Sequence, residues 1–190
     1  MSPRFFTVGH SNRGIEEFIE ILRDAGIGLV VDVRSFPRSR SNPDYNIEVL
    51  PDRLTFVQIG YRHMPRLAGR RPRQPGFDDL VNGAWRNRSF HNYADYALSA
   101  EFGSALSELV EFGRTRRLVM MCAEAVWWRC HRRIIADYLL LNGHAVCHLM
   151  EHGREEPAKP TPGAMKRGDG KIVYPSGVTA SCLPVFNRRS

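Results

Sequence analysis

Residues 29–34 read Leu-Val-Val-Asp-Val-Arg, a short apolar run that ends in charged side chains. A run of this length, rich in β-branched residues, is typical of a strand buried on both faces in a parallel sheet. Residues 5–8, Phe-Phe-Thr-Val, form a similar run. Between the two runs, apolar residues recur in 15–22 at the i, i+3, i+4 and i+7 spacing of an amphipathic helix, which Gly26 would close. Strand, helix and strand in this order predict a βαβ unit.

The same alternation returns in the second half of the chain. Residues 118–121 and 145–149 are apolar runs of strand length, and the apolar residues of 134–139 between them have helical spacing. Because strands and helices alternate at both ends of the chain, we predict an α/β fold. Its sheet is expected to be open and mainly parallel, with helices on both faces.

The middle of the chain has a less regular pattern. Six prolines between Pro37 and Pro75 leave room only for a short helix near residues 45–54. Helical spacing resumes in residues 90–98 and 102–109. We therefore expect long loops, rich in proline and arginine, at the carboxyl ends of the strands.

The length of 190 residues suits one domain. We expect residues 1–150 to form a single α/β domain and residues 151–190 to form an extension that wraps it or is partly disordered. The sequence has no apolar run near the roughly 18 residues of a membrane span, and its N-terminus does not resemble a signal peptide. The cysteines Cys122, Cys130, Cys147 and Cys182 are too sparse for a disulfide framework. We predict a cytoplasmic protein with reduced thiols and no membrane partner.

The charge of the chain is basic and is carried by arginine. The formal net charge is +7, and only three of the 27 basic residues are lysines. Residues 34–88 hold 11 arginines against five acidic residues. Arginine binds phosphate and carboxylate groups with two parallel donors, so an anionic ligand is one interpretation. A solvated arginine-rich surface is the other, and charge alone does not separate them.

Three groups of polar residues come directly after predicted strands. Since the carboxyl ends of parallel strands meet at one edge of a sheet, we predict that the groups share one cleft. For each, a structural role is the alternative: helix capping for the first, a buried ion pair for the second and packing for the cysteines. The groups are Gly9, His10 and Ser11; Asp32, Arg34, Ser39 and Arg40; and Cys122, Glu124, Cys130, His131 and Arg132.

These residue types suggest chemistry on a phosphate-bearing substrate. Arginines would bind phosphate, Glu124 or Asp32 would transfer protons, and Cys122 would be a nucleophile or would support packing. A zinc site is a further possibility, with candidate ligands Cys122, Cys130, His131 and His148. The seven residues between Cys122 and Cys130 exceed the usual spacing of paired zinc ligands, so we expect no metal and no other cofactor.

With these groups in place, the chain from Phe6 to Leu149 resembles the family called domain of unknown function 488. The resemblance implies the fold and the site, with Tyr61 added to the site, but no reaction. Two positions depart from the family pattern, Ala68 and the segment 127–129, and both concern the rim of the cleft. The resemblance rests on Thr7-Val8-Gly9-His10-Ser11, Asp32-Val33-Arg34, Pro37, Ser39, Arg40, Tyr61, Leu67-Ala68-Gly69-Arg70, Phe90, Tyr93, Cys122, Glu124, Cys130-His131-Arg132 and His148.

Three functions compete at this point. The first is an enzyme acting on a nucleotide or nucleic acid, with Arg34, Arg40 and Arg132 on phosphate. The second is cysteine chemistry like that of rhodaneses, although six residues separate Cys122 from Arg129 where such loops have four or five. The third is a nucleic-acid-binding module without catalysis, which would use the basic residues of 62–88 and 159–171. The sequence leaves the oligomeric state open.

Overall fold

The computed structural model describes residues 4–176 and contains a six-stranded sheet in the order β3-β2-β4-β1-β5-β6. The first five strands in this order are parallel, and β6 runs antiparallel to β5. This arrangement confirms the predicted α/β fold with its mainly parallel sheet. The strands are β1 (Arg4–Gly9), β2 (Leu29–Asp32), β3 (Gly60–His63), β4 (Leu118–Cys122), β5 (Ala145–Leu149) and β6 (Glu155–Pro157).

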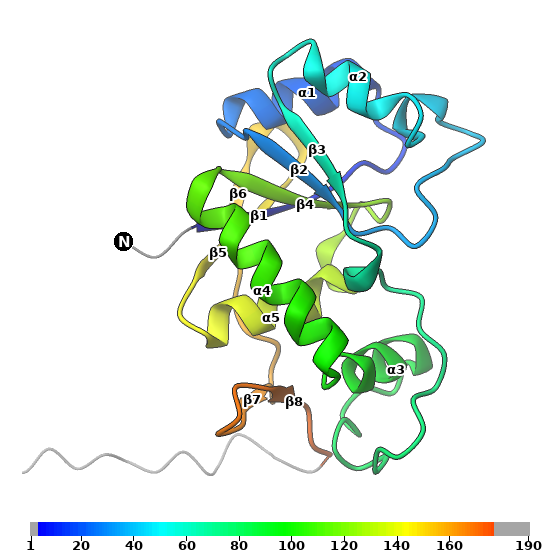
Figure 1. Ribbon diagram of the computed structural model, residues 1–190, viewed down its shortest axis with the longest axis vertical. Helices are drawn as coiled ribbons and strands as arrows, with labels where there is room; N and C mark the ends of the chain where they lie inside the picture. The colour runs from blue at the N-terminus through cyan, green and yellow to red at the C-terminus, as the bar shows by residue number, and fades with distance from the viewer. Residues whose placement is uncertain (1–3, 177–190) are drawn as a thin grey trace, which may run out of the picture.

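Helices cover both faces of the sheet, with α1 and α2 on one side and α4 and α5 on the other (Figure 1). Successive strand residues point to opposite faces, so Val30 packs with α1 and α2, whereas Val31 packs with α3, α4 and α5. Both faces of the central strands are therefore buried, which explains their continuous apolar runs. The helices are α1 (Ile15–Asp24), α2 (Leu50–Thr55), α3 (Arg88–Tyr96), α4 (Ala100–Thr115) and α5 (Arg132–Leu141).

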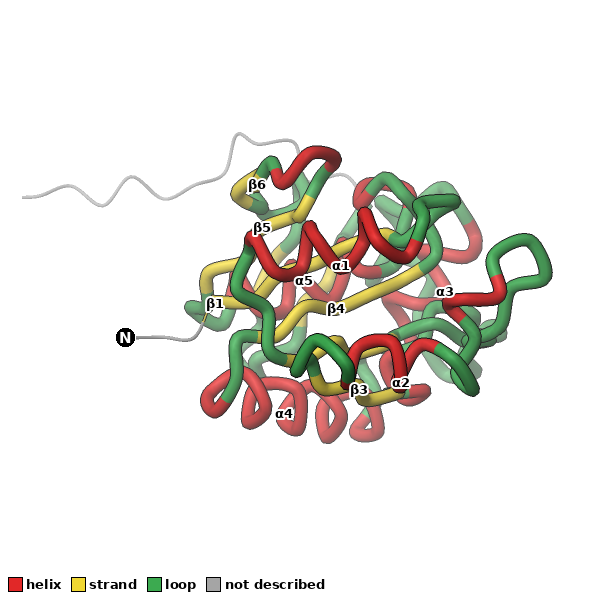
Figure 2. The backbone as a smooth tube through the Cα atoms, turned by 90° about the horizontal axis from the view of Figure 1, so that it is seen from above, coloured by secondary structure: helices red, strands yellow, loops and turns green. Residues whose placement is uncertain are grey.

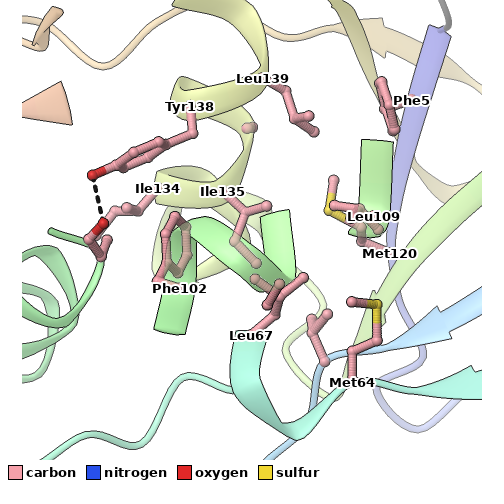
Figure 3. Packing of buried hydrophobic residues seen from close by; sticks show 14 of the residues in the cluster. Phe5, Met64, Leu67, Phe102, Leu109, Met120, Ile134, Ile135, Tyr138 and Leu139 are labelled. Atoms are coloured by element: carbon pink, nitrogen blue, oxygen red, sulfur yellow. Dashed lines mark hydrogen bonds between the residues drawn. The ribbon is translucent and has the colours of Figure 1, made fainter. Parts of the chain in front are cut away.

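The larger core cluster lies between the sheet and α4 and α5 (Figure 3). Ile135 of α5, Leu109 of α4 and Met120 of β4 are fully buried there. Burial of such a side chain contributes about 1.5–3 kcal/mol, so this layer fixes the start of α5 relative to the end of β4. Tyr138 donates a hydrogen bond of 2.8 Å to the carbonyl of Ala97, which ties α5 to the end of α3.

The proline-rich middle differs from the expectation in two ways. The helix expected near residues 45–54 is a 3-10 turn, Pro43–Tyr45, followed by α2. The strand β3 was not predicted, and only loop was expected there. It is an edge strand whose residues are half-buried or exposed, so they form no apolar run in the sequence. Its place is set by pairing with β2, from Leu29 with Gly60 to Asp32 with His63.

Part of the chain after residue 150 packs on the sheet and helices. Besides β6 it forms a hairpin of β7 (Met165–Lys166) and β8 (Ile172–Val173), and Tyr174 is buried with its hydroxyl donating to Asp137 at 2.7 Å. Residues 177–190 of the expected extension, with Cys182, lie outside the described residues, and the domain limit at residue 150 stays a prediction. Within 4–176, every helix is too short or too polar to cross a bilayer.

Candidate functional site

The carboxyl ends of β1, β4 and β2 lie next to one another in the middle of the sheet. In the register of the strands, Gly9 is opposite Cys122 and Asp32 is opposite Met121. The loops after these strands lie at the end of the sheet away from the N-terminus (Figure 2). The backbone amides of His10 and Ser11 donate to the carbonyls of Cys122 and Ala123, at 2.9 and 3.0 Å. The segment Gly9-His10-Ser11 therefore holds the loop after β4, which carries Cys122 and Glu124.

A pocket of about 440 Å³ opens at this edge of the sheet. Of the residues predicted from the sequence, Arg34, Cys122, Glu124 and His131 line it. Cys130, which was placed in the third polar group and considered as a zinc ligand, lines it as well. The other lining residues were not named as site residues, although Gly69, Arg70 and Phe90 belong to the family pattern. These other lining residues are Ser35, Phe36, Arg38, Gly69, Arg70, Ser89, Phe90, Ala123 and Arg129.

Asp32 and Arg34 form a buried ion pair beside the pocket. Arg34 donates from Nε to Asp32 Oδ1 at 2.9 Å and from Nη2 to Asp32 Oδ2 at 2.6 Å. Its Nη2 also donates to the carbonyl of Tyr45 at 2.7 Å, and the hydroxyl of Tyr61 donates to Asp32 Oδ2 at 2.7 Å. Asp32 is fully buried and Arg34 is 4% exposed, so their charges are satisfied mainly by each other.

His10 completes this buried network in its neutral form. Its Nδ1 lies 2.8 Å from the carbonyl of Ser11 and its Nε2 lies 3.2 Å from Nη1 of Arg34. Burial, and then the charge of Arg34, lowers the pKa of His10 to about 4. At neutral pH the ring can therefore donate to Ser11 and accept from Arg34. The ring also stacks on Tyr45, with centroids 4.1 Å apart.

Two cysteines and a histidine meet at the floor of the pocket. Ligand atoms of Cys122, Cys130 and His131 all lie within 4.8 Å of one another. The buried Arg132 donates from Nε to Cys130 Sγ at 3.1 Å and from Nη2 to the carbonyl of Glu124 at 2.6 Å. Burial raises the pKa of Cys130, but the hydrogen bond with Cys122 and the charges of Arg132 and His131 outweigh it and lower that pKa well below its usual range. The hydrogen bond with Cys130, together with burial, raises the pKa of Cys122.

The rim of the pocket is charged and aromatic. Glu124, Arg70 and Arg129 are exposed, and among residues 4–176 none of the three forms an ion pair. Arg38 pairs with the exposed Glu48, and the Arg70 guanidinium lies over Phe36, 5.5 Å from the ring centroid. Phe36 is 68% exposed, so its ring is available to a ligand.

The remaining predicted residues do not line the pocket. Gly9, His10, Asp32, Tyr61 and Arg132 lie behind its wall, where they hold the lining residues through the contacts described above. Ser11 supports the wall through its backbone, whose amide donates to Ala123 and whose carbonyl lies 2.8 Å from His10 Nδ1. Ser39 and Arg40 lie outside the lining, and the Ser39 hydroxyl accepts from the backbone amide of Asn42 at 3.1 Å.

His148 lies behind the pocket and should make stability depend on pH. Its Nδ1 lies 2.8 Å from the Thr7 hydroxyl, and its ring stacks on Trp127 with centroids 4.4 Å apart. Burial, and then the charge of Arg132, lowers the pKa of His148 to about 4. The unfolded chain then binds more protons below its ordinary pKa of about 6.5, so the free energy of unfolding should fall by about 1–3 kcal/mol between pH 6.5 and pH 4.

Chemical denaturation of the native chain and of His148→Asn at several pH values measures this effect. The two proteins should differ most at neutral pH and converge towards pH 4, because the asparagine does not titrate. The neighbours of His148 are the same in both proteins, so their contributions to the pH dependence cancel. These neighbours are Thr7, Trp127, Arg132 and, on the adjacent strand, Glu156. Parallel curves for the two proteins would contradict the pKa given to His148.

Comparison with known proteins identifies the family. No curated protein and no solved structure matches the chain. The model of the family described as domain of unknown function DUF488 matches residues 14–139, a range that includes β2, β4 and every lining residue of the pocket. This match confirms the resemblance drawn from the sequence motifs. The chain belongs to the DUF488 family.

Proposed function

We propose that the chain is an enzyme that acts on a phosphate-bearing substrate, a nucleotide or nucleic acid, with Glu124 as the group that transfers a proton. The observation that supports this proposal most is the placement of Glu124. Its carboxylate lines a pocket of about 440 Å³ together with four arginines, and it makes no ion pair among the described residues. A pocket of this size suits a nucleotide or one unit of a strand.

The arginines of the rim supply the affinity for phosphate. Arg70 and Arg129 have no carboxylate partner within residues 4–176, so their donors are free for an anion. Arg34 is more deeply buried and forms an ion pair with Asp32. We therefore expect it to hold the pocket wall in place and to contribute less to phosphate binding than Arg70 and Arg129. Guanidinium groups match phosphate oxygens in pairs, and their hydrogen bonds to anions contribute about 1.5–3 kcal/mol each.

An aromatic side chain on the rim favours a substrate with a base. Phe36 presents most of its ring to solvent, although exposure of an apolar ring of this size is unfavourable. Stacking of a base on such a ring contributes about 1–3 kcal/mol. Arginine donors and an exposed ring in one pocket therefore fit a nucleotide better than inorganic phosphate.

Variants of the rim arginines test the binding step. We expect Arg70→Ala and Arg129→Ala each to weaken binding of a labelled single-stranded oligonucleotide about 10-fold at low salt. Each should also reduce the slope of log affinity against log salt by about 0.7. Arg40→Ala is the matched control, because Arg40 is exposed on the same loop as Arg38 but does not line the pocket. Fluorescence anisotropy over a salt series measures all three.

The role of Glu124 is tested separately from binding. We expect Glu124→Gln to keep affinity and to lower turnover of nucleotides or oligonucleotides by about 10²–10⁴-fold, as followed by mass spectrometry of the products. Glu111→Gln, on the exposed side of α4, is the control. Equal product formation by Glu124→Gln and the native chain would reject the proton-transfer role. Binding without any turnover by the native chain would favour a nucleic-acid-binding module instead.

A further inference from the structure

The floor of the pocket has a geometry that the proposed function does not use. Cys130 Sγ and His131 Nδ1 are 3.6 Å apart, and the Cys122 thiol lies in the same cluster, all within 4.8 Å. For a tetrahedral zinc ion with Zn–S of about 2.3 Å and Zn–N of about 2.0–2.1 Å, the sulfur and nitrogen ligands are about 3.5 Å apart. The separation of these two atoms therefore already fits one shared metal ion.

The fold brings these ligands together despite their spacing in the sequence. Cys122 ends β4, and His131 directly precedes α5, while the segment between them folds back through the 3-10 turn Trp127–Arg129. This segment is fixed at two points, Trp127 by stacking on His148 and Glu124 by the bond from Arg132 to its carbonyl. The number of residues between the two cysteines therefore does not indicate how far apart they lie in the fold.

The imidazole of His131 is held in place by packing and by a hydrogen bond of 3.6 Å between its Nδ1 and Cys130 Sγ. Its ring packs against Gly69, where any Cβ would overlap it, and against the edge of Tyr93, with centroids 5.0 Å apart. The Nε2 atom is buried and has no partner among the described residues, and Nδ1 contacts Cys130 Sγ. A fixed imidazole whose Nδ1 faces a thiol is placed to share a metal ion with that sulfur.

We infer that Cys122, Cys130 and His131 form a binding site for a divalent transition-metal ion of the zinc type, with one coordination position open to the pocket. Thiolate and imidazole are the ligands that zinc prefers. All three residues line the pocket, and three protein ligands with a fourth position free is the usual arrangement of a catalytic zinc site.

The surroundings of the sulfur atoms support this site. The buried Arg132 donates from Nε to Cys130 Sγ at 3.1 Å. Donors of this kind orient thiolate ligands and stabilise their charge. Two thiolates and a divalent ion sum to no net charge, so the buried Arg132 leaves the site positive, as an anionic substrate requires.

The inference does not depend on the proposed function, because metal binding can be measured without a substrate. Cobalt(II) is the probe, since its complexes with thiolate ligands have charge-transfer bands and its tetrahedral complexes have strong visible bands. The full chain is treated with chelator, kept reduced, and titrated with cobalt(II) and then with zinc. We expect one equivalent of cobalt(II) to bind with both kinds of band, and one equivalent of zinc to displace it.

Cysteine variants identify the ligands. We expect Cys122→Ser and Cys130→Ser each to weaken cobalt(II) binding by about 100-fold or more and to reduce the charge-transfer intensity, whereas Cys147→Ser should bind as the native chain does. Cys147 is the matched control, because it is also a buried free cysteine but belongs to the opposite core cluster. His131→Asn serves as a third ligand variant if a serine variant fails to fold by circular dichroism.

Two results would overturn the site. One is a folded, fully reduced native chain that shows no charge-transfer band at one equivalent of cobalt(II). The other is a band that persists unchanged in the folded Cys122→Ser, Cys130→Ser or His131→Asn chain. Neither result bears on phosphate binding by the rim arginines, so failure of the metal site and failure of the proposed function are distinguishable.

Discussion

Asp32→Ala is expected to lower the free energy of unfolding by about 3–5 kcal/mol. The carboxylate of Asp32 is fully buried and accepts hydrogen bonds from Arg34 Nε, Arg34 Nη2 and the hydroxyl of Tyr61. Alanine would leave the Arg34 guanidinium buried without a counter-charge, and the cost of that unpaired charge is the main part of the loss. Urea denaturation at pH 7, followed by circular dichroism, measures it.

Two further variants test whether the loss of stability comes from the burial of this ion pair. Asp44→Ala removes the partner of Arg53, 3.1 Å away in a pair that is 52% and 36% exposed, and should change stability by about 0–1 kcal/mol. The double variant Asp32→Leu with Arg34→Met should recover much of the loss, because it removes both charges. A loss for Asp32→Ala no larger than that for Asp44→Ala would contradict the assignment of a buried, mutually dependent pair.

The central strands could be predicted from the sequence because they are buried on both faces and therefore form continuous apolar runs. The apolar runs that begin at residues 29, 118 and 145 are strands, and α1 begins at Ile15, as its spacing indicates. Gly26 follows α1 with a φ of 63°, the left-handed conformation that favours glycine at a helix end. Such signals are strong wherever the solvent is excluded, and they weaken at the sheet edge, where β3 was missed.

The rim of the pocket could not be predicted because loop conformation decides it. Arg38 and Arg40 are equivalent in the sequence, yet only Arg38 lines the pocket. The loop is set by bonds that no periodicity reveals: the Ser39 amide donates to Asn46 Oδ1 at 2.6 Å, and the Ser39 hydroxyl accepts from the Asn42 amide. The sequence therefore indicates that arginines gather here but not which of them face a ligand.

The cysteine cluster shows a different limit. Ligand spacing along the chain is informative only when the ligands share one turn or hairpin, and Cys122 and Cys130 belong to different elements. The stronger signal is topological: one cysteine ends the central strand and the other precedes the next helix, so both lie at the same edge of the sheet. The positions of the two cysteines at element ends therefore predict that they lie close together, although seven residues separate them in the sequence.

Gly9→Ala is expected to lower the free energy of unfolding by about 3 kcal/mol, although it adds a single methyl group. Gly9 ends β1 with its Cα facing the loop after β4, and a Cβ there would overlap the carbonyl group of Glu124 and the Cα of Ala125. Since these are backbone atoms, no side chain can rotate away. The loop must shift, which would strain the bonds from the His10 and Ser11 amides to the carbonyls of Cys122 and Ala123.

Gly103→Ala is the matched control for this substitution. Gly103 lies inside α4, where a Cβ would meet no atom within 4 Å apart from its chain neighbours and the backbone of its own helix, so alanine should raise stability by about 0.5–1 kcal/mol through helix propensity. The two variants thus have opposite expected signs for the same chemical change. Because the displaced segment carries Glu124, Gly9→Ala should also weaken oligonucleotide binding in the pocket, whereas Gly103→Ala should not. If Gly9→Ala is as stable as the native chain, the loop after β4 can move away from β1 at little cost. The hydrogen bonds between the ends of β1 and β4 would then not hold the pocket wall rigidly.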